Sequence, residues 1–250
     1  MDLITAAAVA YVSKDGIEKL LGPTFEYYGQ GLKNLTESFN IKAKENLKKI
    51  FGRAIVKKGH ELEKNGIINP RIIKEIVLDG AFCDTNIISE YYSGILASSR
   101  TEDGNDEGIH YINILKGLSS KQLKLHYAIY SKFFKEHKGE EYNLHSQTER
   151  NKLKVYFSIQ EVFEIFKLKN IEDLNQLTSE AFPAIYHADL VESYKFDTSK
   201  QEKQFEFSIT LLGTSLFIQA LGYGEIFTPR CLGDARIEEI IKNIMPLNEI

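Results

Sequence analysis

The spacing of apolar residues in the first half of the chain is the feature that most constrains the fold. Between residues 32 and 64, apolar side chains recur every three or four positions: Leu32, Leu35, Phe39, Ala43, Leu47, Ile50, Phe51, Ala54 and Leu62. This is the period of the α-helix, so the spacing predicts one long helix with a single apolar stripe. Other helices must cover that stripe, which favours a helical bundle.

Shorter segments around this one repeat the helical signal. Residues 3–30 are interrupted by glycines, and Pro23 suits the first turn of a new helix. Asn69-Pro70 is expected to open a further helix, and Asp84 is expected to cap the one after it. Residues 1–117 are therefore predicted to form an N-terminal helical bundle.

The second half of the chain changes to a mixed pattern of helices and strands. Ser119 is followed three residues later by Gln122, and Ser158 by Glu161, which is the capping-box pattern that starts a helix. Between these two helices, the segment Lys154–Ser158 is predicted to form a short strand.

A longer helix is predicted over residues 171–192, with a fresh start near Thr178 because Pro183 would interrupt it. Beyond it, residues 194–196 and 204–209 alternate apolar and polar side chains on either side of a polar link, which is typical of a β-hairpin. The order helix, strand, helix, helix, hairpin is that of a winged helix.

The expected fold is therefore mainly α, with an N-terminal helical bundle followed by a winged-helix-like α+β module that contains a small β-hairpin. The bundle would span residues 1–117, the module residues 118–224, and a C-terminal helix residues 225–250.

Charge bears on what the winged-helix-like module can bind. Winged helices commonly bind DNA by placing their third helix in the major groove. Here the predicted third helix has no lysine or arginine and carries Glu172, Asp173, Glu180, Asp189 and Glu192. Because cations that contact phosphates supply most of the affinity for DNA, a packing or protein-binding module is favoured. A nucleic-acid-binding regulator is the alternative.

The polar face of the predicted long helix is basic. Nine lysines and arginines in residues 32–64 stand against four glutamates. Such a face can meet phosphates or anionic lipid, or can simply be a solvated surface. The candidate residues for phosphate or lipid are Lys42, Lys44, Lys48, Lys49, Arg53, Lys57 and Lys58.

Patterns that would indicate an enzyme or a metal site are missing from the sequence. The acidic loop that starts at Asp103 fails as a calcium loop, because Ile114 stands where a bidentate carboxylate is required. His126 falls on the apolar side of its predicted helix, with no second metal ligand at a suitable spacing. No phosphate-binding glycine loop, nucleophile elbow or CxxC pair occurs. We therefore expect no catalytic residues, no cofactor and no metal, although an enzyme built from scattered residues stays open.

Bulk properties bear on the compartment. A net charge of −4 is that of an ordinary soluble protein. Two widely separated cysteines fit a reducing cytoplasm better than a disulfide framework, so a cytoplasmic protein is expected. The apolar run Leu3–Val12 has about half the length that a bilayer-spanning helix needs. We interpret it as a helix that is buried or lies on a surface, and peripheral contact with a membrane is the alternative.

Three stretches of the sequence resemble the Abi-alpha family of bacterial abortive-infection proteins. They are LLGPTFEYYGQGLKNLTESF (residues 20–39), SEYYSGILASSRTEDGNDEG (89–108) and LSSKQLKLHYAIYS (118–131). The resemblance covers roughly residues 17–221, and its most specific parts are the segments GILASSRTE and LLGP. It implies a role in defence against bacteriophage and supplies no catalytic residues.

The resemblance, together with the absence of catalytic motifs, predicts a defence component that acts by binding, as a sensor or an effector. A protein partner or a phage component is expected, and homo-oligomerisation is compatible with the sequence. A membrane-acting effector is a further alternative. The polar junction after the helix that contains Ser93 is the candidate binding loop, with residues Ser98, Ser99, Arg100, Thr101 and Glu102.

Overall fold

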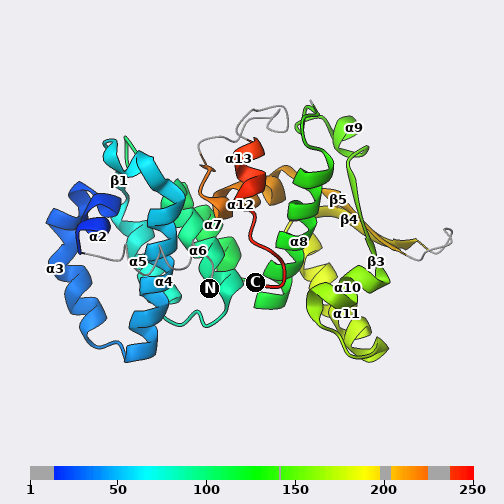
Figure 1. Ribbon diagram of the computed structural model, residues 1–250, viewed down its shortest axis with the longest axis horizontal. Helices are drawn as coiled ribbons and strands as arrows, with labels where there is room; N and C mark the ends of the chain where they lie inside the picture. Colours follow the sequence, from blue (N-terminus) through cyan, green and yellow to red (C-terminus); the bar gives the residue numbers. More distant parts are fainter. Residues whose placement is uncertain (1–13, 141, 198–203, 225–236) are drawn as a thin grey trace. The chain divides into compact units, whose positions relative to one another are not determined.

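The computed structural model describes residues 14–140, 142–197, 204–224 and 237–250 (Figure 1). The described chain is mainly helical, with two small antiparallel sheets. It divides into two compact units. Unit 1 comprises residues 1–117 and 219–225, and unit 2 comprises residues 118–218 and 226–250.

Unit 1 is built from helices that surround a buried pair. Its elements are α2 (Lys14–Leu21), α3 (Pro23–Glu37), α4 (Ile41–Lys58), the 3₁₀ helix η1 (Gly59–Glu63), β1 (Ile67–Ile68), α5 (Pro70–Gly80), α6 (Asn86–Ser98), β2 (Arg100–Thr101) and α7 (Gly108–Lys116). The central pair is α4 with α6, which pack along each other. Every residue of α6 from Ser89 to Ser98 is buried, so α6 is the core helix of this unit.

The prediction of one long helix over residues 32–64 was wrong. α3 ends at Glu37 and α4 begins at Ile41, because the Asn40 side chain accepts a hydrogen bond of 2.9 Å from the backbone N–H of Ala43. A capping asparagine satisfies donors that a new helix would otherwise leave unpaired, so it competes with continuation of the previous helix. At the other end, Gly59 has a φ of 49° and terminates α4.

Two further boundaries in unit 1 test the sequence patterns. Pro70 is the first residue of α5 and Asn69 caps it, as predicted. The prediction that Asp84 caps α6 was wrong, because Thr85 occupies the cap position and α6 begins one residue later than expected.

Unit 2 combines helices with a three-stranded sheet. Its elements are α8 (Ser120–Glu136), α9 (Gln147–Arg150), β3 (Lys154–Ser158), α10 (Ile159–Phe166), α11 (Ile171–His187), β4 (Val191–Asp197), β5 (Gln204–Ile209) and α13 (Ile237–Lys242). α12 (Leu211–Leu221) begins in unit 2 and ends in unit 1. Both predicted capping boxes, at Ser119 and Ser158, are formed.

The predicted β-hairpin is confirmed. β4 and β5 pair antiparallel, and β5 also pairs with β3, so the order in the sheet is β3-β5-β4. β5 is the central strand and is buried from Phe205 to Ile209, whereas β4 lies at an edge. The hairpin connection, residues 198–203, lies outside the described residues.

The predicted fresh start of a helix near Thr178 was wrong. α11 runs without a break from Ile171 to His187, with Pro183 inside it. Proline weakens a helix because it lacks an N–H donor. Packing outweighs this loss here, since the buried Phe182 ring lies 5.1 Å from the ring of Phe205 and 5.0 Å from that of Phe207. The expected end at residue 192 was also too late, because β4 begins at Val191.

Candidate functional site

The predicted junction loop centres on Arg100, which is only 6% exposed. Its guanidinium donates to the carbonyl oxygens of Lys19, Leu20, Glu61, Leu62 and Lys64 at 2.8–3.3 Å. These carbonyls lie at the C-terminal end of α2 and in and after η1, where backbone acceptors lack partners within a helix. Arg100 therefore ties α2 to η1 and to Lys64 directly after it, and its guanidinium donors are engaged inside unit 1.

The two serines of the junction are also engaged. The Ser98 hydroxyl donates to the carbonyl oxygen of Gln219 at 3.2 Å and accepts from the backbone N–H of Gly224 at 3.0 Å. The Ser99 hydroxyl donates to the carbonyl oxygen of Ile95 at 2.7 Å. Both serines are buried. At these two positions the junction is therefore part of the packed interior of unit 1.

Only the end of the junction reaches solvent. Arg100 and Thr101 form β2, which pairs with Ile68 and Ile67 of β1, where the sequence predicted a loop. The Thr101 hydroxyl donates to the Asp103 carboxylate at 2.7 Å, and this bond lowers the pKa of Asp103. Glu102 is exposed. The acidic loop is therefore organised by hydrogen bonds of its own and by contacts from Asn69 and Arg71.

The predicted basic face of α4 divides into two groups. Lys42, Lys44 and Lys48 are exposed. The other members turn toward neighbouring groups and are at most half-exposed: Lys49, Arg53, Lys57 and Lys58. Lys58 lies 3.3 Å from the Glu61 carboxylate of η1. A phosphate or lipid surface would therefore have three exposed lysines of the seven candidates.

Three of the inward cations, Lys49, Arg53 and Lys57, gather at Glu90 and Asn86 of α6. Glu90 is 2% exposed, forms an ion pair with Lys57, and lies 3.7 Å from the guanidinium of Arg53. Arg53 also donates to the carbonyl oxygen of Asn86 at 3.1 Å, and Lys49 donates to the side chain of the same asparagine. Burial lowers the pKa of Lys49, and the nearby Arg53 lowers it further. This network links α4 to α6 and accounts for three of the seven residues of the predicted basic face.

His126 lies in the core of unit 2, as its spacing predicted. Its side chain is fully buried, and Nε2 lies 3.0 Å from the carbonyl oxygen of Gly213. A carbonyl oxygen only accepts, so Nε2 carries the proton in this contact. Burial lowers the pKa of His126 to about 3, and the hydrogen bond opposes this shift in part. The imidazole is thus neutral at ordinary pH.

Cys83 has no features of a reactive thiol. It is buried, and it donates to the carbonyl oxygen of Asp79 at 3.3 Å. Burial raises the pKa of the thiol to about 12, and the carboxylates of Asp79 and Asp84 add to this rise. Because the thiolate is the nucleophile, such a pKa makes Cys83 a packing residue.

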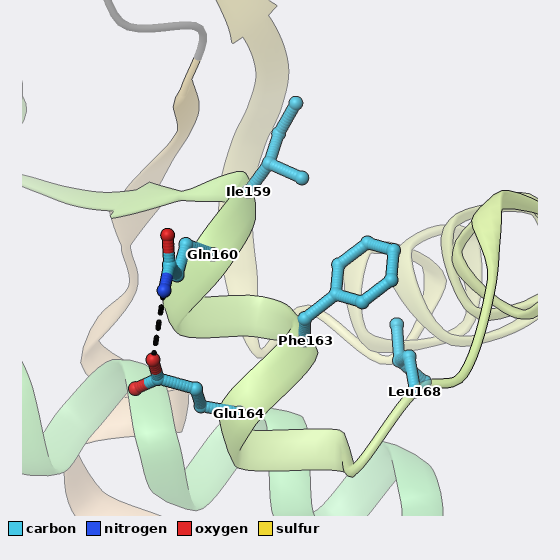
Figure 2. A pocket seen from close by; sticks show the side chains of 5 residues that line it. All are labelled: Ile159, Gln160, Phe163, Glu164 and Leu168. Carbon is cyan, nitrogen blue, oxygen red and sulfur yellow. Dashed lines mark hydrogen bonds between the residues drawn. The ribbon is translucent and has the colours of Figure 1, made fainter.

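A shallow hollow of about 600 Å³ lies over α10 in unit 2. Figure 2 shows the Phe163 ring and the Leu168 side chain facing the same space, with Ile159 at its rim. Gln160 and Glu164 of α10 also line the hollow, and Gln160 donates to Glu164 at 3.3 Å. Sites for small molecules usually enclose the ligand and bring several polar groups together. This hollow is open and mostly apolar, so it is a surface feature of α10.

The exposed face of α11 is acidic. Its solvent-facing residues are Ile171, Glu172, Asn175, Gln176, Ser179, Glu180, Tyr186 and His187. Two of them are carboxylates, and the helix contains no lysine or arginine. We call this surface the α11 face. It repels phosphate groups and suits a cationic partner.

Exposed aromatic rings adjoin the C-terminal end of the α11 face. Tyr186 is 47% exposed, Tyr194 is 37% exposed and Phe196 is 45% exposed. Tyr186 and Tyr194 have ring centroids 6.0 Å apart, so α11 and β4 contribute to one aromatic surface. Large apolar groups on a surface often mark an interaction site when they are contiguous.

The sequence did not identify these aromatic residues as candidates. Alternation in residues 194–196 predicted a strand, and in a strand with one covered face Tyr194 and Phe196 would be buried together. Their exposure follows from the edge position of β4, which depends on the pairing of β5 with β3. No local pattern in the sequence predicts the pairing of β5 with β3.

Within the part of the chain that the structure describes, no three histidine, cysteine, aspartate or glutamate side chains are arranged to hold a metal ion. No described helix is long and apolar enough to cross a membrane. The segment Leu3–Val12 lies outside the described residues. In comparisons with known proteins, no protein-family model, no curated protein and no solved structure matches this chain.

Proposed function

We propose that this protein is a component of bacterial defence against bacteriophage and that it acts by binding a protein partner through unit 2. The observation that carries the binding mode is the α11 face, which presents carboxylates, exposes no lysine or arginine and adjoins exposed aromatic rings. The role in defence rests on the resemblance of three sequence stretches to the Abi-alpha family.

The order of elements supports a winged-helix-like module in unit 2. Apart from the short helix α9 between α8 and β3, the elements α8, β3, α10, α11, β4 and β5 follow one another as helix, strand, helix, helix and hairpin. The last strand of the sheet in sequence, β5, is the central one, and it lies between β3 and β4. In this scheme α11 corresponds to the helix that enters the major groove in DNA-binding members.

The charge of α11 supports a protein partner in place of DNA. A helix that enters a DNA groove places its exposed side chains among phosphates, where Glu172 and Glu180 would be repelled. A partner with lysine or arginine on its surface would be attracted by the same carboxylates, and its association would be accelerated. The α11 face therefore favours a cationic protein.

The proposal is tested by phage challenge of bacteria that express the full chain. Expression should lower the plating efficiency of at least some phages, and the double variant Glu172→Lys/Glu180→Lys should restore plating because it reverses the charge of the α11 face. Glu45→Lys is a matched control, since Glu45 is an exposed glutamate on α4. Circular dichroism of each variant checks that it folds.

Two outcomes contradict the proposal. Unchanged plating across diverse phages with the unaltered chain would remove the role in defence. Protection that survives charge reversal at both Glu172 and Glu180 would remove the α11 face as its binding surface.

One observation favours a second candidate function, which is binding of nucleic acid through unit 1. Lys42, Lys44 and Lys48 are exposed on α4 and are available to contact phosphates. A gel shift with duplex DNA at low salt, abolished by Lys42→Gln/Lys44→Gln/Lys48→Gln, would support it. No shift at low salt, where phosphate contacts are strongest, would exclude it.

A further inference from the structure

The edge strand β4 offers its backbone to solvent. Among the described strands it pairs with β5 alone, so backbone donors and acceptors along its outer edge have no partner strand. Four consecutive residues, Ser193 to Phe196, are exposed. From Ser193 to Asp197 the register with β5 is regular, which gives a straight stretch of the length that strand pairing uses.

The usual protections of an edge strand are weak along this stretch. Proteins block such edges with proline, with bulges or with lysines that point into the approach path. β4 contains no proline, and its irregularity lies at its beginning, between Val191 and Ser193. Its one lysine, Lys195, lies 3.1 Å from the Glu206 carboxylate on the neighbouring strand. The edge beyond Ser193 is thus open to another strand.

Aromatic rings stand beside this edge in fixed positions. The Tyr194 ring packs edge-on against the buried Phe182 at 5.7 Å, and the Phe196 ring lies 5.0 Å from the buried Phe205. Each exposed ring is therefore backed by a core ring, and binding would cost little loss of side-chain freedom. The faces of such rings attract lysine and arginine cations.

The charge around the edge selects the partner. Between residues 170 and 197 the chain carries one lysine, Lys195, against six carboxylates: Glu172, Asp173, Glu180, Asp189, Glu192 and Asp197. The carboxylate of Glu192 is held by the Gln147 side chain of α9 at 2.8 Å. Asp189 precedes β4 and Asp197 ends it, so carboxylates flank the open stretch along the chain, and they complement a cationic segment and oppose nucleic acid.

We propose that the open edge of β4 binds an extended, lysine- or arginine-bearing segment of a partner protein as a fourth strand of the sheet. Backbone hydrogen bonds to β4 supply affinity that is independent of sequence, and the cations of the segment lie over Tyr194 and Phe196. This inference rests on the proposed function, because it specifies how unit 2 holds its protein partner.

The test uses the full chain and a fluorescent peptide of about eight residues in which arginine and valine alternate, a length that covers the open stretch. Fluorescence anisotropy should detect binding. The same peptide with alternate backbone amides methylated keeps its charge and loses donors for strand pairing, and it should bind about 10-fold more weakly or not at all. A peptide with glutamate in place of arginine should not bind.

Variants of β4 locate the site. Tyr194→Ser/Phe196→Ser should weaken binding of the arginine-valine peptide about 10-fold through the loss of two cation–π contacts. Lys195→Ser, on the other face of the same strand, is the matched control and should not weaken binding, because it removes a positive charge and no aromatic ring. Thermal melts establish whether each variant is folded, and peptide affinities are compared only between folded variants.

The outcomes separate this inference from the proposed function. Equal binding of the methylated and unmethylated peptides would show that charge alone is recognised and would overturn strand addition. Absence of peptide binding, with protection still abolished by Glu172→Lys/Glu180→Lys, would overturn the inference and leave the proposed function standing. Self-association in sedimentation that is lost in Tyr194→Ser/Phe196→Ser would identify a second copy as the occupant and would also overturn it.

Discussion

At the scale of single residues, Arg100 shows how one side chain can join segments that are distant in sequence. It belongs to the GILASSRTE segment, and the sequence predicted it as a residue of the candidate binding loop. In the structure its five carbonyl partners come from α2 and from the end of η1. A planar guanidinium can reach several acceptors at once, which a lysine ammonium cannot do in the same geometry.

The first prediction concerns the N–H donors of the Arg100 guanidinium. Arg100→Lys keeps the positive charge but leaves several of the five buried carbonyl oxygens without a donor, and should lower the free energy of unfolding by about 2 kcal/mol. Arg71→Lys is the matched control, because the Arg71 side chain is 68% exposed and pairs with Asp106 at the surface. Its effect should stay below about 0.5 kcal/mol. Urea denaturation measures both, and equal effects would contradict the assigned role of Arg100.

The second prediction concerns His126 and pH. Its pKa is about 3 in the folded protein because of burial, against about 6.5 in the unfolded chain. Between these values the unfolded state binds a proton that the folded state does not, so the stability from a neutral His126 is complete above pH 6.5 and is lost as the pH falls. The expected loss is about 1.4 kcal/mol per pH unit between roughly pH 6 and pH 4.

This loss is measured as the slope of the unfolding free energy against pH. His126→Gln removes the titrating group, so its slope in the same interval should be shallower by that amount. His145→Gln is the control, because His145 is exposed. Parallel curves for the unaltered chain and His126→Gln would contradict the assignment.

At the scale of elements, the pairing of α4 with α6 depends on buried charge as well as on apolar packing. Glu90 of α6 meets Lys57 and Arg53 of α4, and all three side chains are largely buried. Removal of one partner from a buried ion pair leaves an uncompensated charge, which costs more than the pair itself contributes. The basic pattern of α4 therefore has a structural cause at these positions.

The third prediction is a double-mutant cycle on this pair. Glu90→Gln should lower the free energy of unfolding by about 3 kcal/mol, and Lys57→Met in the same chain should recover part of that loss. The coupling energy should reach at least about 1 kcal/mol. Lys138 and Glu238 form an ion pair of 3.0 Å in unit 2 with both side chains exposed, and this control pair should couple by less than about 0.5 kcal/mol. Indistinguishable couplings would contradict the role of Glu90.

At the scale of the whole molecule, the chain passes between the two units three times, after residues 117, 218 and 225. Unit 1 is therefore completed by a segment from far along the chain. A Cβ atom at Gly94 of α6 would lie 1.8 Å from the carbonyl oxygen of Ala220, so this segment lies directly against the core helix. Ser98 adds hydrogen bonds to Gln219 and Gly224.

The fourth prediction follows from this chain path. A fragment of residues 1–117 lacks the completing segment and should melt at least about 5 °C lower than the same fragment with residues 219–225 attached by a flexible linker of about 20 residues. A scrambled version of the attached segment controls for the linker. Equal melting temperatures of the three fragments would show that residues 219–225 do not stabilise unit 1.

The sequence by itself determined most of the local structure of this protein. Capping boxes at Ser119 and Ser158, the proline that opens α5 and the alternation that forms the β4–β5 hairpin act over a few residues, so their signals can be read directly. The spacing of His126 likewise placed it correctly in the core.

The tertiary structure alone decided how far α11 extends and which polar groups reach solvent. α11 continues through Pro183 because the buried Phe182 packs against β5. Arg100 and Glu90 are internal because carbonyls or cations from other segments surround them, and Tyr194 is exposed because β4 lies at the edge of its sheet. Each of these outcomes depends on contacts between residues far apart in the chain, whose free energy no local pattern records.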